Sequence, residues 1–375
     1  MTLPSQIIHQ LERNGITFCA LYPGAKIQQL YDLMSKRLQS ISVSKEEEGV
    51  GICAGASLAG ANSCMLIQST GFGNMINALC SLTLTYELPL LILASWRGIY
   101  KESIPAQVRL GKSLPNILKA IGCHLHIIKK PADLSKIENA AQQAYQNNSL
   151  QAVLISPQLW ASTSSPKLVP KLPSRSTPIE ISNELPPLKS AQHTREEIIR
   201  IVVPYLQNKL VISNIGMPSR ELYHILPQPS NFYMLGSLGL ASSIGLGVAL
   251  NSKKSVIVID GDGSLLSNLG SLSTIASKAP TNLTILAIDN GVHGSTGNQP
   301  TSTQTCVDLA KTAQSLGIRE VYRGSTAKQL ESILSNLQSG PHFIHIPARP
   351  GNAQVPTIPL SPQKIKQLFM QAVLA

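Results

Sequence analysis

The chain has 375 residues, of which 43% are hydrophobic and 14% are charged. This composition supplies enough apolar side chains for well-packed cores and excludes an intrinsically disordered protein. Lysine and arginine outnumber aspartate and glutamate by 31 to 20, which gives a net charge of +11. Because these basic residues are scattered and aromatic residues make up only 4% of the chain, a solvated basic surface is favoured over a nucleic-acid-binding protein.

The beginning of the sequence and the pattern of its cysteines are typical of a cytoplasmic protein. The first twelve residues lack the apolar core of a signal peptide, and the most apolar run, residues 88–96, is too short to cross a bilayer. The six cysteines form no Cys-x-x-Cys pair and mostly lie in apolar runs, as buried reduced thiols do. These features predict a cytoplasmic protein that does not insert into a membrane.

The first 160 residues alternate helical and strand patterns. Apolar spacing predicts helices at residues 7–13, 27–38, 47–58, 74–85 and 135–146. Short apolar runs predict strands at residues 16–21, 64–67, 90–94 and 152–155. Continuous apolar runs are typical of a parallel sheet that is covered on both faces.

A change in composition divides the chain. Residues 161–188 are rich in serine and proline and lack periodicity, which predicts an extended linker. The alternation then resumes, with strands predicted at residues 210–213, 255–260, 283–288 and 342–346. We therefore expect an α/β protein in which two doubly wound parallel-sheet domains, residues 1–160 and 189–375, are joined by the linker.

The sharpest local signal is Gly261-Asp262-Gly263-Ser264, which lies between a predicted strand and a helix. Glycines let backbone N–H groups approach an anion, and a helix N-terminus adds partial positive charge. A second predicted strand ends at Asp289-Asn290-Gly291. If the two strands are neighbours, Asp262 and Asn290 meet at one edge, where their oxygens suit Mg²⁺ beside bound phosphates. Alone, Gly-Asp-Gly is more often an ordinary turn.

The paired motifs resemble the diphosphate-binding signature of thiamine-diphosphate (ThDP) enzymes. The resemblance implies that the metal ligands are Asp262, Asn290 and the backbone carbonyl of Val292. It also implies that the diphosphate and its metal are contacted by Gly261, Gly263, Ser264 and Asn290.

Two further positions follow from the same resemblance. Gly236-Ser237-Leu238-Gly239 is similar to a segment whose glycine carbonyl binds the cofactor's amino group and whose apolar residue holds the cofactor bent. Gly236 and Leu238 match those positions, although core packing is the alternative for Leu238. His293 follows the metal motif and is either a proton donor to the reaction intermediate or a packing residue of the loop.

Three consecutive acids, Glu46, Glu47 and Glu48, precede a stretch of small residues. By themselves they are typical of a solvated first helical turn. In ThDP enzymes a glutamate before a small-residue helix shares a proton with the pyrimidine ring, and the spacing to Gly55 matches Glu46 to it; a slip of one residue would select Glu47. Because this glutamate and the diphosphate site usually come from different subunits, the resemblance implies a homodimer or higher homo-oligomer.

The branch of the family is indicated by residues 46–60, 68–74, 95–98 and 289–301. They resemble sulfopyruvate decarboxylase, with its two subunits fused in one chain, and phosphonopyruvate decarboxylase. The resemblance implies decarboxylation of a small anionic 2-oxo acid, with 3-sulfopyruvate giving sulfoacetaldehyde and CO₂, or with phosphonopyruvate as the alternative. Tyr22-Pro23-Gly24 is similar to acetolactate synthases, so carboligation stays open, as does a ThDP-binding protein without catalysis.

A substrate with a second acid group needs guanidinium, ammonium or amide donors. Arg97 is the first candidate, because it follows the carboxyl end of a predicted strand. Weaker candidates, for which exposure to solvent is the alternative, are Lys45, Gln107, Arg109 and Gln299.

Overall fold

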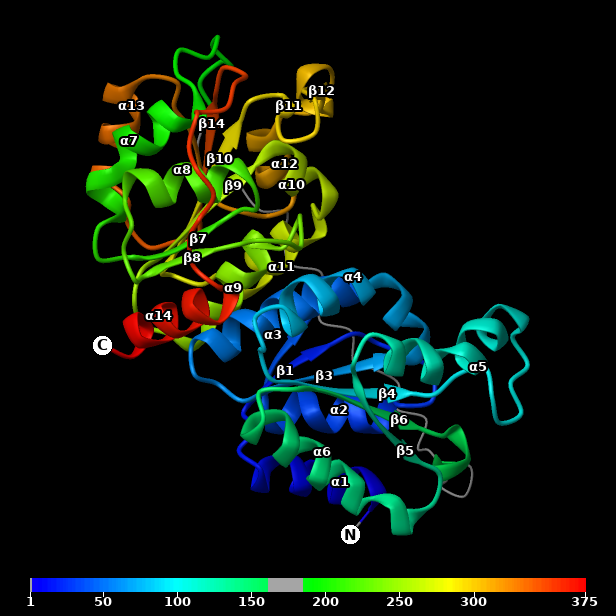
Figure 1. Cartoon of the computed structure of the whole chain (residues 1–375). Helices are drawn as coiled ribbons and strands as arrows, with labels where there is room; N and C mark the ends of the chain where they lie inside the picture. Colours follow the sequence, from blue (N-terminus) through cyan, green and yellow to red (C-terminus); the bar gives the residue numbers. More distant parts are fainter. Residues whose placement is uncertain (1, 161–184) are drawn as a thin grey trace. The chain divides into compact units, whose positions relative to one another are not determined.

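A computed structural model describes residues 2–160 and 185–375, which form two compact units (Figure 1). The first unit lies within residues 2–160, and the second consists mainly of residues 185–375. Most of the predicted linker, residues 161–184, lies outside the described residues. Within the described ranges, no helix is both long and apolar enough to cross a membrane.

The first unit is built on a six-stranded parallel sheet with the order β2-β1-β3-β4-β6-β5. Its strands are β1 (Phe18–Leu21), β2 (Gln39–Ser42), β3 (Ser63–Gln68), β4 (Leu90–Ser95), β5 (His124–Ile128) and β6 (Leu150–Ile155). The four apolar runs predicted as strands are confirmed as β1, β3, β4 and β6. Strand β2 was not predicted from its sequence, because this edge strand buries only Ile41.

Helices cover both faces of this sheet (Figure 1). They are α1 (Leu3–Arg13), α2 (Gln28–Arg37), α3 (Glu46–Leu58), α4 (Ile76–Ala78), α5 (Pro105–Ala120) and α6 (Ser135–Gln146). Short 3₁₀ turns are η1 (Ser69–Asn74), η3 (Pro131–Asp133) and η4 (Pro157–Trp160), and η2 (Leu79–Leu84) is a π-helical turn. The helix expected at residues 74–85 is thus divided between α4 and η2. Helix α5 was not predicted from the sequence, because Pro115 lies inside it and proline is unfavourable within a helix.

Successive side chains of the strands in the first unit point to opposite faces of the sheet and pack against different helices. Cys19 and Leu21 of β1 join the cluster formed with α1, α2 and α6. On the other face, a methyl group at Gly49 of α3 would lie 2.6 Å from the Cε atom of Met65 in β3. Glycine at this position lets α3 pack closely on the sheet, and this close packing places the start of α3 near the carboxyl ends of the strands.

The second unit contains another six-stranded parallel sheet, with the order β13-β14-β10-β9-β7-β8. Its strands are β7 (Leu210–Ser213), β8 (Asn231–Tyr233), β9 (Val256–Gly261), β10 (Leu283–Asp289), β13 (Glu320–Arg323) and β14 (His342–Pro347), with a hairpin of β11 (Val292–His293) and β12 (Gln299–Pro300). Its helices are α7 (Arg195–Leu206), α8 (Met217–Ile225), α9 (Ala241–Asn251), α10 (Asp262–Ser267), α11 (Gly270–Lys278), η5 (Ser302–Gln304), α12 (Leu309–Ser315), α13 (Ala327–Ser335) and α14 (Pro362–Leu374).

Both sheets share one topology. Counted from the first strand of each unit, and leaving the hairpin aside, each sheet has its strands in the order 2-1-3-4-6-5. The order reverses beside the first strand, and such a switch point forms a crevice at the carboxyl ends of the strands. The prediction of two doubly wound α/β sheets is therefore confirmed.

The cysteines follow the burial prediction with one exception. All six are free thiols, and Cys19, Cys53, Cys64 and Cys123 are buried. Cys80 is half-buried, whereas Cys306 is exposed, so the prediction of a buried thiol is wrong there. Cys306 lies in a polar loop after η5 rather than in an apolar strand, which explains its exposure.

Candidate active site

Glu46 begins α3 with only 6% of its surface exposed. Asn74 Nδ2 donates a hydrogen bond of 2.9 Å to its Oε2 atom. A methyl group at Gly71 would lie 2.6 Å from the carboxyl carbon of Glu46, so a side chain there would displace the carboxylate. The turn η1 therefore closes on the carboxylate and fixes its position.

The two following acids have other partners. Glu47 Oε2 is 2.7 Å from Lys45 Nζ, in an ion pair in which the lysine side chain is 42% exposed. Glu48 is fully buried and accepts hydrogen bonds from the backbone N–H and the hydroxyl of Ser44, at 2.7 and 2.6 Å. Because Glu47 is already paired with Lys45, the geometry favours Glu46 as the cofactor-facing acid, and its assignment stays a prediction. Lys45, a weaker substrate candidate, has its charge balanced by Glu47.

Arg97, the first candidate for binding the substrate, lies just after the carboxyl end of β4. It is buried and forms an ion pair with Glu102. Its Nε and Nη2 atoms donate to Glu102 at 2.7 and 2.8 Å, and its Nη1 atom donates to Gln68 Oε1 at 3.0 Å. The nearby guanidinium lowers the pKa of Glu102 to about 2. Gln68 Nε2 also lies 3.4 Å from Gln107 Oε1, so the structure brings the predicted residues Arg97 and Gln107 into one cluster.

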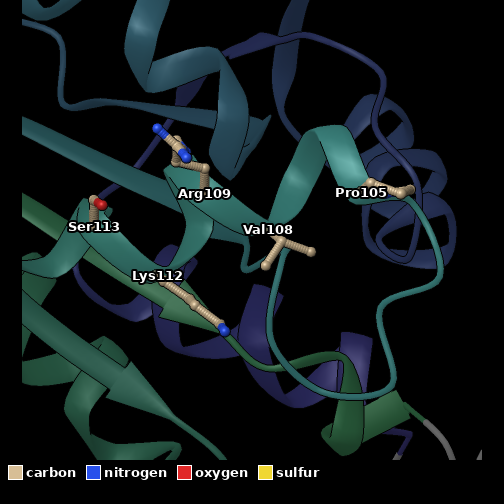
Figure 2. A pocket seen from close by; sticks show the side chains of 5 residues that line it. All are labelled: Pro105, Val108, Arg109, Lys112 and Ser113. Atoms are coloured by element: carbon tan, nitrogen blue, oxygen red, sulfur yellow. The ribbon is translucent and has the colours of Figure 1, made fainter.

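Arg109 faces a different place. It lines a shallow surface pocket of about 550 Å³ on α5, together with Pro105, Val108, Lys112 and Ser113 (Figure 2). The side chains of Arg109 and Lys112 extend in different directions from the helix (Figure 2). The pocket therefore does not present them as one paired anion-binding site.

In the second unit, β9 and β10 are neighbours, with Gly261 opposite Ile288. Asp262 and Asn290 therefore follow adjacent strand ends, as the sequence analysis required. Asp262 is 3% exposed, and burial raises the pKa of its carboxyl group although Thr301 donates to it at 2.5 Å. Asp289, between the two motifs, accepts hydrogen bonds from Thr303 at 2.8 Å and bonds His345 at 2.9 Å.

These residues fit a magnesium ion. The Asn290 Nδ2 atom is buried without a hydrogen-bond partner among the described residues and would be available to donate to a diphosphate oxygen, while Asn290 Oδ1, the atom that would bind the metal, accepts a hydrogen bond of 3.3 Å from the Val292 N–H. The Asp262 carboxylate is buried without a neighbouring cation, and its raised pKa expresses that cost. A carboxylate, an amide and the carbonyl of Val292 form the hard oxygen set that Mg²⁺ prefers.

The loop at Gly236–Gly239 is tied to the diphosphate motif. The N–H of Gly239 donates to Ser264 Oγ at 3.1 Å, and Asn268 Nδ2 donates to the Gly239 carbonyl at 3.0 Å. Leu238 is 43% exposed, so core packing is not its role in this unit. The loop thus presents Gly236 and an exposed leucine at the same rim as Gly263 and Ser264.

His293 lies directly beside the diphosphate motif. A methyl group at Gly263 would lie 2.6 Å from its Cε1 atom. In the hairpin, His293 pairs with Gln299, whose Oε1 accepts a hydrogen bond of 2.9 Å from Thr296. Gln299 is therefore engaged within the hairpin.

Several contributing residues were not singled out by the sequence analysis. They are Gln68, Gly71, Asn74, Glu102, Thr301 and Asn352. Gln68, Gly71 and Asn74 lie in the stretch that carried the family resemblance, so this signal was present without a role attached. Thr301 likewise ends the stretch 289–301 of the resemblance, whereas no local pattern marks Asn352, because its partners Gly294 and Arg195 are distant in the chain.

Comparison with known proteins agrees with this geometry. The chain matches "Thiamine pyrophosphate enzyme, N-terminal TPP binding domain" at residues 1–120 and "Thiamine pyrophosphate enzyme, C-terminal TPP binding domain" at residues 212–346. Thiamine pyrophosphate is another name for ThDP. A putative thiamin diphosphate-dependent enzyme from Mycobacterium smegmatis has a TM-score of 0.69 at 13% identity, covering 94% of this chain and 100% of that one, which shows the same fold.

Curated relatives narrow the branch. The chain is 40% identical to sulfopyruvate decarboxylase from Methanosarcina acetivorans, over 98% of this chain and 97% of the relative. It is 32% identical to phosphonopyruvate decarboxylase from Streptomyces viridochromogenes, over 90% and 86%. Separate sulfopyruvate decarboxylase subunits also match. A beta subunit from Methanothermobacter thermautotrophicus is 46% identical over 48% of this chain and 95% of the subunit. An alpha subunit from Methanocaldococcus jannaschii is 35% identical over 41% of this chain and 93% of the subunit. The chain thus belongs to the thiamine pyrophosphate enzymes, within the family of sulfopyruvate and phosphonopyruvate decarboxylases.

Proposed function

We propose that this chain is a ThDP- and Mg²⁺-dependent decarboxylase that converts 3-sulfopyruvate to sulfoacetaldehyde and CO₂. The observation that carries the proposal is the 40% identity to a sulfopyruvate decarboxylase over 98% of the chain. Identity to the phosphonopyruvate decarboxylase is 32% over 90%, so phosphonopyruvate is the second candidate substrate.

The second unit would hold the cofactor. Asp262, Asn290 and the Val292 carbonyl would bind Mg²⁺, which neutralises the diphosphate. The backbone would cradle the diphosphate and the pyrimidine at Gly236, Gly261, Gly263 and Ser264, with Leu238 as an apolar wall. When bound, ThDP supplies the carbon nucleophile and the electron sink that decarboxylation of a 2-oxo acid requires.

The first unit would supply the proton chemistry and substrate binding. Glu46, which is buried and held by Asn74 and the turn at Gly71, would share a proton with the pyrimidine nitrogen of the cofactor. Arg97 and Gln107 would donate hydrogen bonds to the acid groups of the substrate. His293, beside Gly263 at the other half-site, is proposed to deliver the proton that completes the product aldehyde.

We further propose a homodimer or higher homo-oligomer whose active sites lie at subunit interfaces. Relatives of this family occur as separate alpha and beta subunits, each matching less than half of this chain. A carboxylate in one unit and a diphosphate site in another are parts that such assemblies bring together across a closed symmetric interface.

The direct test measures CO₂ release from 3-sulfopyruvate, phosphonopyruvate and pyruvate side by side, with ThDP and Mg²⁺ added together. We expect the highest kcat/KM for 3-sulfopyruvate and a single aldehyde product. Release of CO₂ together with a product in which two oxo-acid molecules have been joined would instead indicate carboligation. A raised melting temperature with cofactor but no CO₂ from any acid would leave ThDP binding without catalysis, because ligands that bind only the folded state stabilise it.

A further inference from the structure

Glu102 shapes the cluster around Arg97 in a way that no sequence pattern indicated. The side chain of Arg97 is 5% exposed and that of Glu102 is 7% exposed. The guanidinium group donates a hydrogen bond to each of the two carboxylate oxygens. The backbone N–H groups of Gly98 and Ile104 donate to the same carboxylate at 3.1 and 3.2 Å. Four donors thus fix Glu102 in place, and its pKa of about 2 keeps it ionised near neutral pH.

The cluster therefore offers hydrogen bonds without the net positive charge expected of an arginine. Two guanidinium N–H groups point to Glu102 and one to Gln68, which leaves two of the five donors of Arg97 for a ligand. Gln68 Nε2 also donates to Thr70 Oγ1 at 2.7 Å and approaches Gln107. The charges of Arg97 and Glu102 cancel within the cluster.

The position of the cluster connects it to the acid chemistry. Gln68 ends β3, and the turn that follows contacts Glu46 through Gly71 and Asn74. One short segment thus contacts Arg97 at its start and Glu46 at its end. Because Glu46 would face the cofactor in the proposed function, this segment holds the Arg97 cluster beside the cofactor-facing acid, where it would meet the second acid group of a bound substrate.

We propose that Glu102 is a specificity-determining residue that makes this site select a singly charged sulfonate over a doubly charged phosphonate. The inference rests on the proposed function. A buried carboxylate beside the guanidinium repels each additional negative charge, and the repulsion is strong where water is excluded. A sulfonate keeps one charge, whereas a phosphonate loses a second proton near neutral pH, as phosphate groups do.

The first arm of the test uses the unaltered enzyme with ThDP and Mg²⁺. We expect the ratio of kcat/KM for 3-sulfopyruvate to that for phosphonopyruvate to rise on the order of tenfold between about pH 5.5 and pH 8.5, as the phosphonate becomes a dianion. Titrations of the enzyme and cofactor act on both substrates and cancel in this ratio, so the change reports the tail group alone.

The second arm uses Glu102→Gln, which keeps the shape of the side chain and removes its charge. The ratio should fall on the order of tenfold at the upper pH, and its dependence on pH should flatten. Glu12→Gln is the matched control, because Glu12 also pairs with an arginine. Its partner is Arg37, and the pair joins the last turns of α1 and α2. That variant should keep the ratio of the unaltered enzyme.

Each outcome decides the matter. A ratio that is independent of pH in the unaltered enzyme, or a Glu102→Gln variant that loses both activities equally at an unchanged ratio, would overturn the role of Glu102 and leave the decarboxylase proposal intact. CO₂ release from neither acid by the unaltered enzyme would instead overturn the proposed function. If Glu102→Gln fails to fold, the first arm can still overturn the proposal, because a ratio that is independent of pH in the unaltered enzyme contradicts it.

Discussion

Neighbouring residues of the same type have different roles here because burial and hydrogen bonding differ at each position. Glu46 faces Asn74 and Gly71, Glu47 pairs with Lys45, and Glu48 bonds the backbone before the helix. Glu46 and Glu48 are both buried without a cationic partner among the described residues, but Glu48 faces Ser44, whereas Glu46 faces the turn that follows β3. In the proposed function this position lets the Glu46 carboxyl group meet the pyrimidine nitrogen of the cofactor, whereas the Glu47 carboxylate is held by Lys45.

This difference predicts the effect of two matched substitutions. Glu46→Gln should retain ThDP binding but lower turnover by about 10²- to 10⁴-fold, the usual worth of a positioned acid–base group. Glu47→Gln should change turnover far less. Steady-state kinetics with calorimetry of ThDP binding checks both, and a larger loss in Glu47→Gln would shift the activating acid by one position.

At the scale of elements, the hairpin β11–β12 carries the Val292 carbonyl and His293 and is held by the segment after β14. Asn352 Nδ2 donates to the Gly294 carbonyl at 2.7 Å, and Asn352 Oδ1 accepts from Arg195 at 2.9 Å. Arg195 is itself buried in an ion pair with Glu221. A rigid part of the unit thus anchors a hairpin that packs few apolar side chains of its own.

The anchor predicts a selective loss. Asn352→Ala should weaken Mg²⁺-dependent ThDP binding on the order of tenfold, as expected when a residue that supports a metal ligand is removed. Asn336→Ala, which removes only a hydrogen bond to the Ser332 carbonyl at the end of α13, is the matched control. Titration calorimetry checks this, and equal cofactor affinities in the two variants would show that Asn352 does not position the hairpin.

At the scale of the whole molecule, the two units carry different parts of the proposed active site on sheets of identical topology. Position by position, the end of β4 with Arg97 corresponds to the end of β10 with Asn290, because both strands are fourth in their units. In the proposed function the first unit would contribute an acid and a guanidinium, and the second would contribute metal ligands and glycines. Neither unit alone contains the full set.

This division predicts complementation between inactive variants. If each site takes Glu46 from one subunit and Asp262 from another, a mixture of Glu46→Gln and Asp262→Ala chains should regain activity. With random pairing in a dimer, about a quarter of the original activity is expected, since half of the dimers carry one intact site of two. Activity is measured after joint refolding or co-expression, and a mixture as inactive as its components would place both residues of a site in the same chain.

The sequence alone determined the parts of this protein that depend on local pattern. Apolar runs specified the central strands, and Gly261-Asp262-Gly263 with Asn290 specified the ends of two of them, because periodicity and turn chemistry are local properties. Tertiary structure decided what depends on contacts between distant residues: the pairing of β9 with β10, the closure of Gly71 and Asn74 on Glu46, and the anchoring of Gly294 by Asn352. It also showed that Arg97 is neutralised, since an arginine in the sequence reveals its charge but not its partner.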